Sequence, residues 1–398
     1  MGPVEIVKSI YWVGANDRTT ELFEGLWPIF QEGVSYNAYL IKDEKNVLVD
    51  LVKNMKTDDF LDNVQKILPT LKLDYIVLNH LEPDHTGALN TIRRVAPNVT
   101  FLVSEKGKKL LKAFYGIEKN VSVVKDGDEL STGERTLKFF YTPFVHWPET
   151  IMTYEKSDCI LFSCDAFGSY GALRGTIFDD DSVDLEFYKK EMLRYYSNIV
   201  ATFSRQVIKT AEKLESVPVK IIAPSHGLVW KRHPSEPIKL YKRWATYSSI
   251  PSEEGITLLY ASMYGNTEKA MYSVAKGIAD TGVRVDIFDV TRTHLSYILP
   301  SLWQKRGVVI GAPTYEGSLF PPMVNVLEMA ALKRVMHKKV FVFGSFGWSG
   351  GASRKIRQIV EPLRWEIVDV LEFNGRATAE VLQEAEKLGR KIASTVMS

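Results

Sequence analysis

The segment Asn79-His80-Leu81-Glu82-Pro83-Asp84-His85-Thr86-Gly87 follows an apolar run at 75–78 and precedes a helical pattern. Four of the six residues from His80 to His85 carry an imidazole or a carboxylate that could bind a metal ion. In α/β folds, binding sites collect where the chain leaves the carboxyl end of a strand. The segment therefore predicts an α/β fold with a metal site at the edge of a sheet.

Three further candidate ligands also come directly after strand-like runs: His146 after 137–141, Asp165 after 160–163 and His226 after 220–223. The same placement of every candidate predicts one common site. The other three histidines have no such context, and we expect them at the surface or in ordinary packing: His233, His294 and His337.

The candidate ligands comprise four imidazoles and three carboxylates, without a thiolate. This composition argues against a structural zinc site, whereas mixed nitrogen and oxygen ligation suits iron or manganese. Two divalent ions facing three carboxylates would be neutralised by one bridging hydroxide. A pair of metal sites rich in carboxylate ligands suits a metal that changes oxidation state, so we expect a di-iron centre.

The composition narrows the class of protein. The chain has 398 residues, 45% of them hydrophobic, and a net charge of +2, which predicts two or three soluble domains and no nucleic-acid partner. Its two cysteines, Cys159 and Cys164, cannot supply a four-cysteine iron site. The sequence has no secretion leader and no apolar run long enough to cross a membrane, so we expect a cytoplasmic protein.

A polar stretch from Ser248 to Gly255 reads as a linker between two domains, which we place at 1–249 and 255–398. The first is rich in short strand-like runs and contains a long helical region, 185–214, interrupted at Asn198 and Thr202. In the second, strands and helices alternate strictly, which predicts a doubly wound parallel sheet.

A candidate phosphate loop follows the first strand of the second domain and leads directly into a helix: Ser262, Met263, Tyr264, Gly265, Asn266 and Thr267. The loop is neither a P-loop nor a dinucleotide fingerprint, but hydroxyl and amide groups at a helix N-terminus suit a phosphate. Two more loops follow later strands and offer aromatic residues among glycines: Pro313, Thr314, Tyr315 and Gly317 in one, and Ser345, Phe346, Gly347, Trp348 and Gly350 in the other. A turn that could bind one phosphate group, beside two loops whose aromatic residues could flank a flat ring, predicts FMN.

Residues 1–250 resemble a metallo-β-lactamase-type αββα domain, whose hydrolytic members carry H-x-H-x-D-H at the turn quoted above. This chain has H-x-E-x-D-H, with Glu82 in place of the second histidine. That replacement is accompanied by the segments 146–149 (HWPE), 163–165 (SCD) and 224–227 (PSHG). Together with a flavodoxin-like second domain, these features resemble the flavodiiron proteins (A-type flavoproteins), cytoplasmic enzymes of anaerobes that reduce O2 to water or NO to N2O.

The resemblance implies a role for each residue of the metal site. His80, Glu82 and His146 would bind one iron, Asp84, His85 and His226 the other, and Asp165 would bridge them. Glu149 stands where many members have Asp and is not expected to be a ligand, while Trp147 is expected to wall the pocket. Tyr195 resembles a tyrosine that some members place near the irons as a hydrogen-bond or proton donor. Simple packing on the core is the alternative for Tyr195.

Residues 255–398 resemble a flavodoxin, which implies that 262–267 hold the FMN phosphate while Tyr315 and Trp348 line the isoalloxazine. Glu316 departs from the Asn that is common after the aromatic residue. The family also implies a head-to-tail homodimer, extended in some cases to a tetramer. The external electron donor would be a rubredoxin or the reduced deazaflavin coenzyme F420.

Reduced FMN and diferrous iron together hold the four electrons that O2 needs, whereas reducing two NO needs two. Two other functions stay open. One is a di-zinc hydrolase with an accessory flavodoxin domain, and the other is an electron-transfer module with a vestigial metal site. The preference between O2 and NO does not follow from the sequence.

Overall fold

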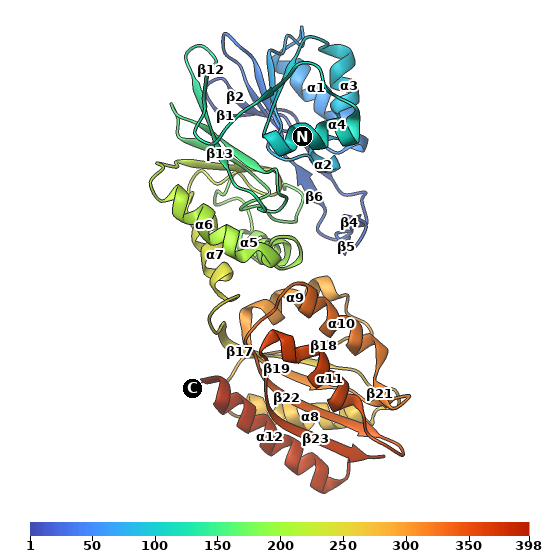
Figure 1. Ribbon diagram of the computed structural model, residues 1–398. Helices are drawn as coiled ribbons and strands as arrows, with labels where there is room; N and C mark the ends of the chain where they lie inside the picture. The colour runs from blue at the N-terminus through green and yellow to red at the C-terminus, as the bar shows by residue number, and fades with distance from the viewer. Residues whose placement is uncertain (398) are drawn as a thin grey trace. The chain divides into compact units, whose positions relative to one another are not determined.

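The computed structural model describes residues 1–397, and the chain divides into two compact units, Met1–Lys242 and Arg243 onward (Figure 1). The division falls inside helix α7 (Ser235–Thr246), a few residues before the predicted linker. The end of α7 belongs to the second unit because the Trp303 indole N–H donates to the Trp244 carbonyl at 3.0 Å. The domain limits 1–249 and 255–398 stay a prediction.

The first sheet of unit 1 contains seven strands in the order β1-β2-β7-β8-β9-β10-β11. Their bounds are β1 Val4–Val7, β2 Ile10–Trp12, β7 Tyr39–Ile41, β8 Val47–Val49, β9 Tyr75–Val77, β10 Thr100–Val103 and β11 Val121–Val123. The strands from β8 to β11 are parallel. Helices α1 (Thr57–Ile67), α3 (Leu89–Val95) and α4 (Glu105–Tyr115) make the crossovers that parallel strands require (Figure 1).

The second sheet of unit 1 has the order β12-β13-β14-β15-β16, and only its last pair is parallel. The bounds are β12 Glu129–Ser131, β13 Thr136–Tyr141, β14 Ile151–Glu155, β15 Ile160–Cys164 and β16 Ile221–Pro224. The two sheets are layered, since the Tyr39 ring of β7 lies 5.1 Å from the Phe162 ring of β15. This arrangement confirms the predicted αββα class.

The predicted helical region at 185–214 is helical throughout but not one regular α-helix. Helices α5 (Leu185–Tyr195) and α6 (Ser204–Leu214) are joined by a π-helical turn, η2 (Tyr196–Val200), and a 3₁₀ turn, η3 (Ala201–Phe203). π-Helical turns inside helices are frequent at functional sites. The remaining short elements of unit 1 are β3 Ala15–Asp17, β4 Leu22–Phe23, β5 Trp27–Pro28, β6 Val34–Tyr36, η1 Asn54–Lys56 and α2 Pro83–Thr86.

Unit 2 contains the predicted parallel sheet, with the order β18-β17-β19-β22-β23. The strands are β17 Glu253–Tyr260, β18 Val285–Asp289, β19 Lys305–Gly311, β22 Lys339–Phe346 and β23 Glu366–Asn374, and a hairpin, β20 Thr314–Tyr315 with β21 Ser318–Leu319, follows β19. The helices are α8 Asn266–Ala279, α9 Leu295–Gln304, α10 Pro321–Leu332, α11 Ala352–Val360, the 3₁₀ turn η4 Glu361–Leu363 and α12 Ala379–Met397.

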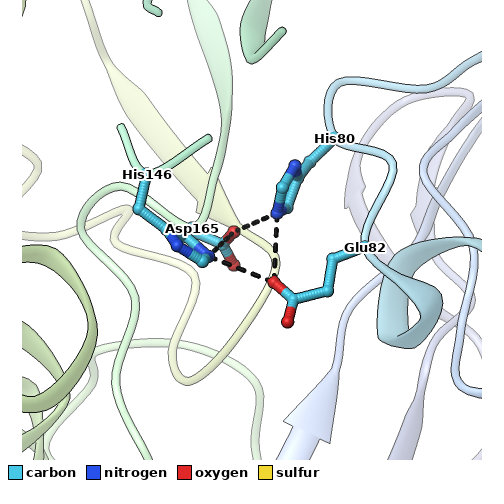
Figure 2. A group of neighbouring side chains, drawn as sticks. All are labelled: His80, Glu82, His146 and Asp165. Carbon is cyan, nitrogen blue, oxygen red and sulfur yellow. Dashed lines mark hydrogen bonds and ion pairs between the residues drawn. The ribbon is translucent and has the colours of Figure 1, made fainter. Parts of the chain in front are cut away.

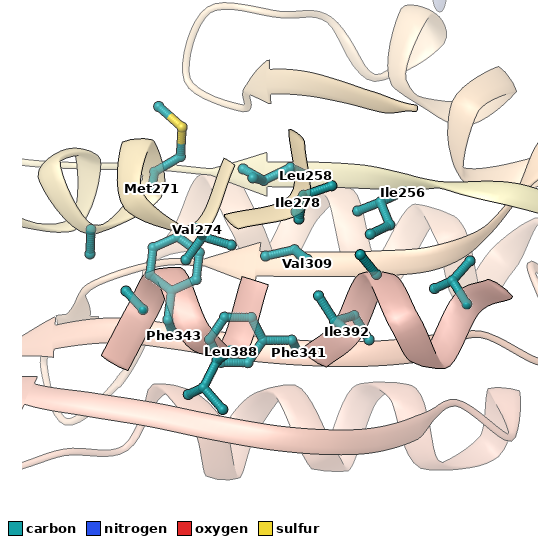
Figure 3. Close-up of a cluster of buried hydrophobic side chains, with 14 of the residues drawn as sticks. Ile256, Leu258, Met271, Val274, Ile278, Val309, Phe341, Phe343, Leu388 and Ile392 are labelled. Atoms are coloured by element: carbon teal, nitrogen blue, oxygen red, sulfur yellow. The ribbon is translucent and has the colours of Figure 1, made fainter. Parts of the chain in front are cut away.

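Helices α8 and α12 cover one face of this sheet and bury a continuous apolar core against it (Figure 3). Leu258 and Val309 on the strands, Val274 on α8 and Ile392 on α12 are all almost fully buried there. Gly389 permits the two helices to approach, because an added Cβ would lie 2.4 Å from the Val274 carbonyl oxygen. Each fully buried aliphatic side chain contributes about 1.5–3 kcal/mol. This core fixes the sheet edge from which the predicted flavin loops project.

Among the described residues, every helix is too short or too polar to span a bilayer.

Candidate functional site

The seven predicted metal ligands come together in unit 1, at the carboxyl ends of four strands. The turns that carry them follow β9, β13, β15 and β16. His80 and Glu82 are two residues apart in an extended segment and therefore point to the same side. Pro83 then begins the short helix α2, which directs Asp84 and His85 elsewhere. The ligand atoms of these seven form two groups, each within 4.8 Å: His80, Glu82, His146 and Asp165 in one, and Asp84, His85 and His226 in the other. A third group, within the same distance, joins Cys164, which the sequence did not single out as a ligand, to His85 and Asp165.

We call His80, Glu82 and His146 the first half of the centre, and Figure 2 shows them around Asp165. Glu82 Oε2 lies 3.1 Å from the Nε2 atoms of both His80 and His146. Asp165 Oδ2 lies 3.5 Å from His80 Nε2 and 3.4 Å from His146 Nε2. Two imidazoles and two carboxylates thus converge on one point.

We call Asp84, His85 and His226 the second half. The two Asp84 oxygens lie 3.3 Å from His85 Nε2 and from His226 Nε2, one on each. Asp165 Oδ1 lies 3.1 Å from His85 Nε2 and 3.3 Å from His226 Nε2. Asp165 therefore turns one oxygen toward each half, which is the geometry of a carboxylate between two metal ions.

The electrostatics of the cluster also fit metal ions. Burial disfavours the imidazolium form, but the facing carboxylates outweigh it and raise the pKa of His80 and His226 to about 10. In the same way the pKa of His85 and His146 rises to about 9. Despite its burial, the pKa of Asp165 is held well below its usual value, chiefly by the charge of His85. Protons thus supply the positive charge that metal ions would bring, and metal binding would displace them.

Several buried atoms of the cluster have no hydrogen-bond partner, namely both Asp84 oxygens, Asp165 Oδ2 and the Nε2 atoms of His85 and His226. Buried polar groups are nearly always hydrogen-bonded, so an exception calls for an explanation such as an ion. These are the atoms that converge between the two halves. The residues present therefore fit a two-metal centre.

Outer contacts fix the orientation of the cluster. His80 Nδ1 lies 2.6 Å from Glu149 Oε1, and His226 Nδ1 donates to the Ser35 carbonyl at 2.7 Å. The Tyr195 hydroxyl is fully buried and donates to Asp165 Oδ1 at 3.0 Å, so Tyr195 does more than pack on the core. Burial raises the pKa of Tyr195 well above its usual value, and the hydroxyl keeps its proton. The Trp147 ring packs edge-on against His80 at 4.9 Å.

A cavity of about 290 Å³ adjoins the centre and reaches Glu82 and Asp84. Its other lining residues include Phe23, Tyr36 and Lys53, none of which the sequence singled out. They come from segments far upstream that carry no motif, so no local signal could have found them. The cavity gives a small molecule a place beside one ligand from each half.

The predicted phosphate loop of unit 2 lies between β17 and α8. Gly265, with φ +85°, is the residue before the first turn of α8, and its N–H donates to Ser262 Oγ at 3.0 Å. The first N–H groups of a helix have no partner within it, which makes this turn an anion site. Thr267 Oγ1 lies 3.0 Å from Ser345 Oγ and so links this loop to the end of β22.

The two aromatic loops project from the same edge, because β17, β19 and β22 are adjacent and parallel. Tyr315 ends β20, and Glu316 adopts φ +48° in the turn, a conformation that asparagine adopts more readily than glutamate. Ser345 and Phe346 belong to the end of β22, and Trp348 beyond it is 85% exposed. Tyr264 is 90% exposed. Large aromatic side chains that are exposed around a phosphate-binding turn suit a ligand with a flat ring and a phosphate group.

Comparisons with known proteins agree with both sites. A family model described as ODP family beta lactamase matches residues 34–227, and one described as Flavodoxin matches residues 258–389. A nitric oxide reductase of Moorella thermoacetica is 32% identical over 403 residues, which cover 99% of each chain. This chain belongs to the flavodiiron proteins.

Solved structures of the family have the same fold over the whole chain. The rubredoxin oxygen:oxidoreductase of Desulfovibrio gigas matches with a TM-score of 0.93 and 27% identity, covering 99% of this chain and 98% of its own. The flavodiiron protein of Giardia intestinalis matches with a TM-score of 0.93 and 29% identity, covering 100% and 97%. Membership of the flavodiiron family implies a di-iron centre and FMN, and the donor set and the three loops of this chain fit both.

The three histidines outside the predicted ligand set lie away from the centre. His233 is exposed, and His294 caps α9 by accepting the Ser296 N–H at 3.1 Å. His337 is partly buried and follows α10. None of them belongs to the groups of candidate metal ligands found among residues 1–397.

Proposed function

We propose that this flavodiiron protein reduces O2 to water, NO to N2O, or both, at a di-iron centre supplied with electrons through FMN. The observation that carries the proposal is Asp165, whose two oxygens face different sets of ligands. His80, Glu82 and His146 would hold one iron, Asp84, His85 and His226 the other, and Asp165 would bridge them. When bound, the two irons and FMN together supply the four electrons that O2 needs or the two that a pair of NO needs.

The protein's own groups orient and protect this centre. Tyr195 keeps its proton, so its hydroxyl stays a donor and holds Asp165 in the bridging orientation. Phe23 and Tyr36 give the adjoining cavity an aromatic wall, and its volume of about 290 Å³ leaves room for a small molecule. In unit 2, the backbone of 262–267 would bind the FMN phosphate, while Tyr315 and Trp348 would flank the ring.

We also propose a head-to-tail homodimer, in which the FMN of one chain faces the irons of the other, with a tetramer as its extension. Tyr264 and Trp348 support this dimer, because these large aromatic side chains are exposed beside the proposed FMN site, where a second chain would cover them. The electron donor would be a rubredoxin or reduced F420. The protein would work in the cytoplasm.

The test is the metal and flavin content of anaerobically purified protein, followed by O2 and NO uptake after reduction with dithionite. We expect about two irons and one FMN per chain. His146→Ala should lower the iron content and abolish gas uptake, while His233→Ala, a change at an exposed histidine, should keep both. Two zinc ions per chain, or no flavin, would contradict the proposal and favour the hydrolase.

A further inference from the structure

The two halves of the metal centre differ in what lies behind their histidines. His80, in the first half, has Glu149 Oε1 at 2.6 Å from its Nδ1. His226, in the second half, donates its Nδ1 hydrogen to the Ser35 carbonyl at 2.7 Å. His80 is therefore backed by a carboxylate and His226 by a neutral oxygen.

Glu149 directs its charge almost entirely at His80. The side chain is fully buried, and the Leu81 N–H donates to the same Oε1 at 3.1 Å. Its other oxygen, Oε2, has no hydrogen-bond partner, and in the described part of the chain no lysine or arginine forms an ion pair with it. Ser104 Oγ donates to the Glu149 carbonyl at 2.7 Å and fixes the backbone there.

The second half also has a buried carboxyl group, Asp50, whose charge acts on His85, but no ion pair joins the two among the described residues. Asp50 is 2% exposed. Its oxygens accept from the Asn79 backbone N–H at 2.7 Å and from the Asn79 side-chain amide at 3.0 Å, rather than from a histidine ring. The asymmetry therefore lies in the direct histidine–carboxylate contact.

Resting on the proposed di-iron function, we propose that Glu149 is a positioning residue that makes the two metal sites unequal. A carboxylate that draws the Nδ1 proton makes the imidazole a stronger donor at Nε2. A stronger donor favours a trivalent ion over a divalent one. The first half would therefore hold a metal ion more tightly than the second half. With iron bound, the site of His80, Glu82 and His146 would have the lower reduction potential of the two.

The first test is a Co²⁺ titration of metal-free protein, which measures two binding constants without any gas chemistry. Glu149→Gln keeps the shape and an acceptor for His80 but removes the charge. One of the two constants should fall about 10–100-fold, and the other should stay within about twofold. Glu149→Asp should restore most of the loss. Ser104→Ala, which loosens the same turn without changing its charge, should leave the ratio of the two constants unchanged.

The second test is an anaerobic redox titration of the iron-loaded protein. Glu149→Gln should bring the two one-electron potentials closer by about 59 mV for each tenfold loss of preference for the oxidised ion. The proposal is overturned if both Co²⁺ constants fall together, if Ser104→Ala has the same effect, or if the separation of the potentials is unchanged. If the iron-loaded wild type takes up neither O2 nor NO, but the metal-free protein binds Co²⁺ at two unequal sites that Glu149→Gln makes more alike, only the proposed function is contradicted.

Discussion

Lys338 offers a sharp test of the electrostatics of unit 2, because its ammonium group is buried and forms no ion pair with an acidic side chain among residues 1–397. It is 2% exposed and donates to the Lys305 carbonyl at 2.6 Å, to Ser252 Oγ at 2.7 Å and to the Trp303 carbonyl at 3.2 Å. Burial lowers the pKa of Lys338 to about 7. In the unfolded chain the lysine pKa is about 10.4.

The sign of the effect follows from proton uptake. Between pH 7 and pH 10 the unfolded chain binds the proton that the folded chain has lost, so the stability of unit 2 rises with pH. Each pH unit contributes at most about 1.36 kcal/mol. Because the folded lysine is still half protonated at pH 7, the gain from pH 7 to pH 9 is about 2 kcal/mol. Below pH 6 both states are protonated and this dependence disappears.

The assay is urea unfolding of the FMN-loaded protein at pH 7, 8 and 9 with a fixed excess of FMN, followed by near-ultraviolet circular dichroism. We expect the urea midpoint of the wild type, relative to Lys338→Met, to rise by about 1 M over this range if m is about 2 kcal/mol/M. Lys339→Met removes a neighbouring lysine that is paired with Glu366 near the surface and should keep the wild-type profile. Parallel profiles for the wild type and Lys338→Met would refute the reasoning and mean that the three oxygens keep the ammonium charged.

Three further outcomes are expected. Tyr195→Phe removes the 3.0 Å hydrogen bond to Asp165, and because a charge-assisted bond contributes about 1.5 kcal/mol or more, the rate of gas reduction should fall about tenfold with iron content unchanged. An unchanged rate would mean that Tyr195 only packs on the core. Gly344→Ala places a Cβ 2.0 Å from the Ala312 carbonyl oxygen, so it should destabilise unit 2 by about 1–3 kcal/mol and weaken FMN binding. Chemical denaturation and a fluorescence titration with FMN measure these effects, and wild-type values would contradict the prediction. Metal binding at pH 7 should release protons from the four imidazoles, whose pKa values lie near 9 to 10, and the affinity for the metal should rise with pH up to that range. Calorimetry in buffers of different ionisation enthalpy measures the proton release, and no release would mean that the imidazoles are not protonated at pH 7.

The sequence by itself determined the class of the fold and predicted the side chains of the proposed metal centre. Strict strand–helix alternation predicted the parallel sheet of unit 2, and ligand-type residues after strands predicted seven side chains that lie together in the structure, but not Cys164, which lies beside His85 and Asp165. These inferences succeed because they depend on local order along the chain. The carboxyl ends of neighbouring parallel strands meet at one edge wherever the strands themselves are placed.

The family resemblance already implied how the ligands divide into halves, but the tertiary structure alone decided which groups support them. The contact between His80 and Glu149 joins positions 69 apart, and that between His226 and Ser35 joins positions 191 apart. Lys53 and Tyr36 reach the cavity, and Lys338 becomes buried, only through the packing of distant segments. No spacing in the sequence encodes such contacts, because hydrogen-bond partners and burial depend on which surfaces meet after folding.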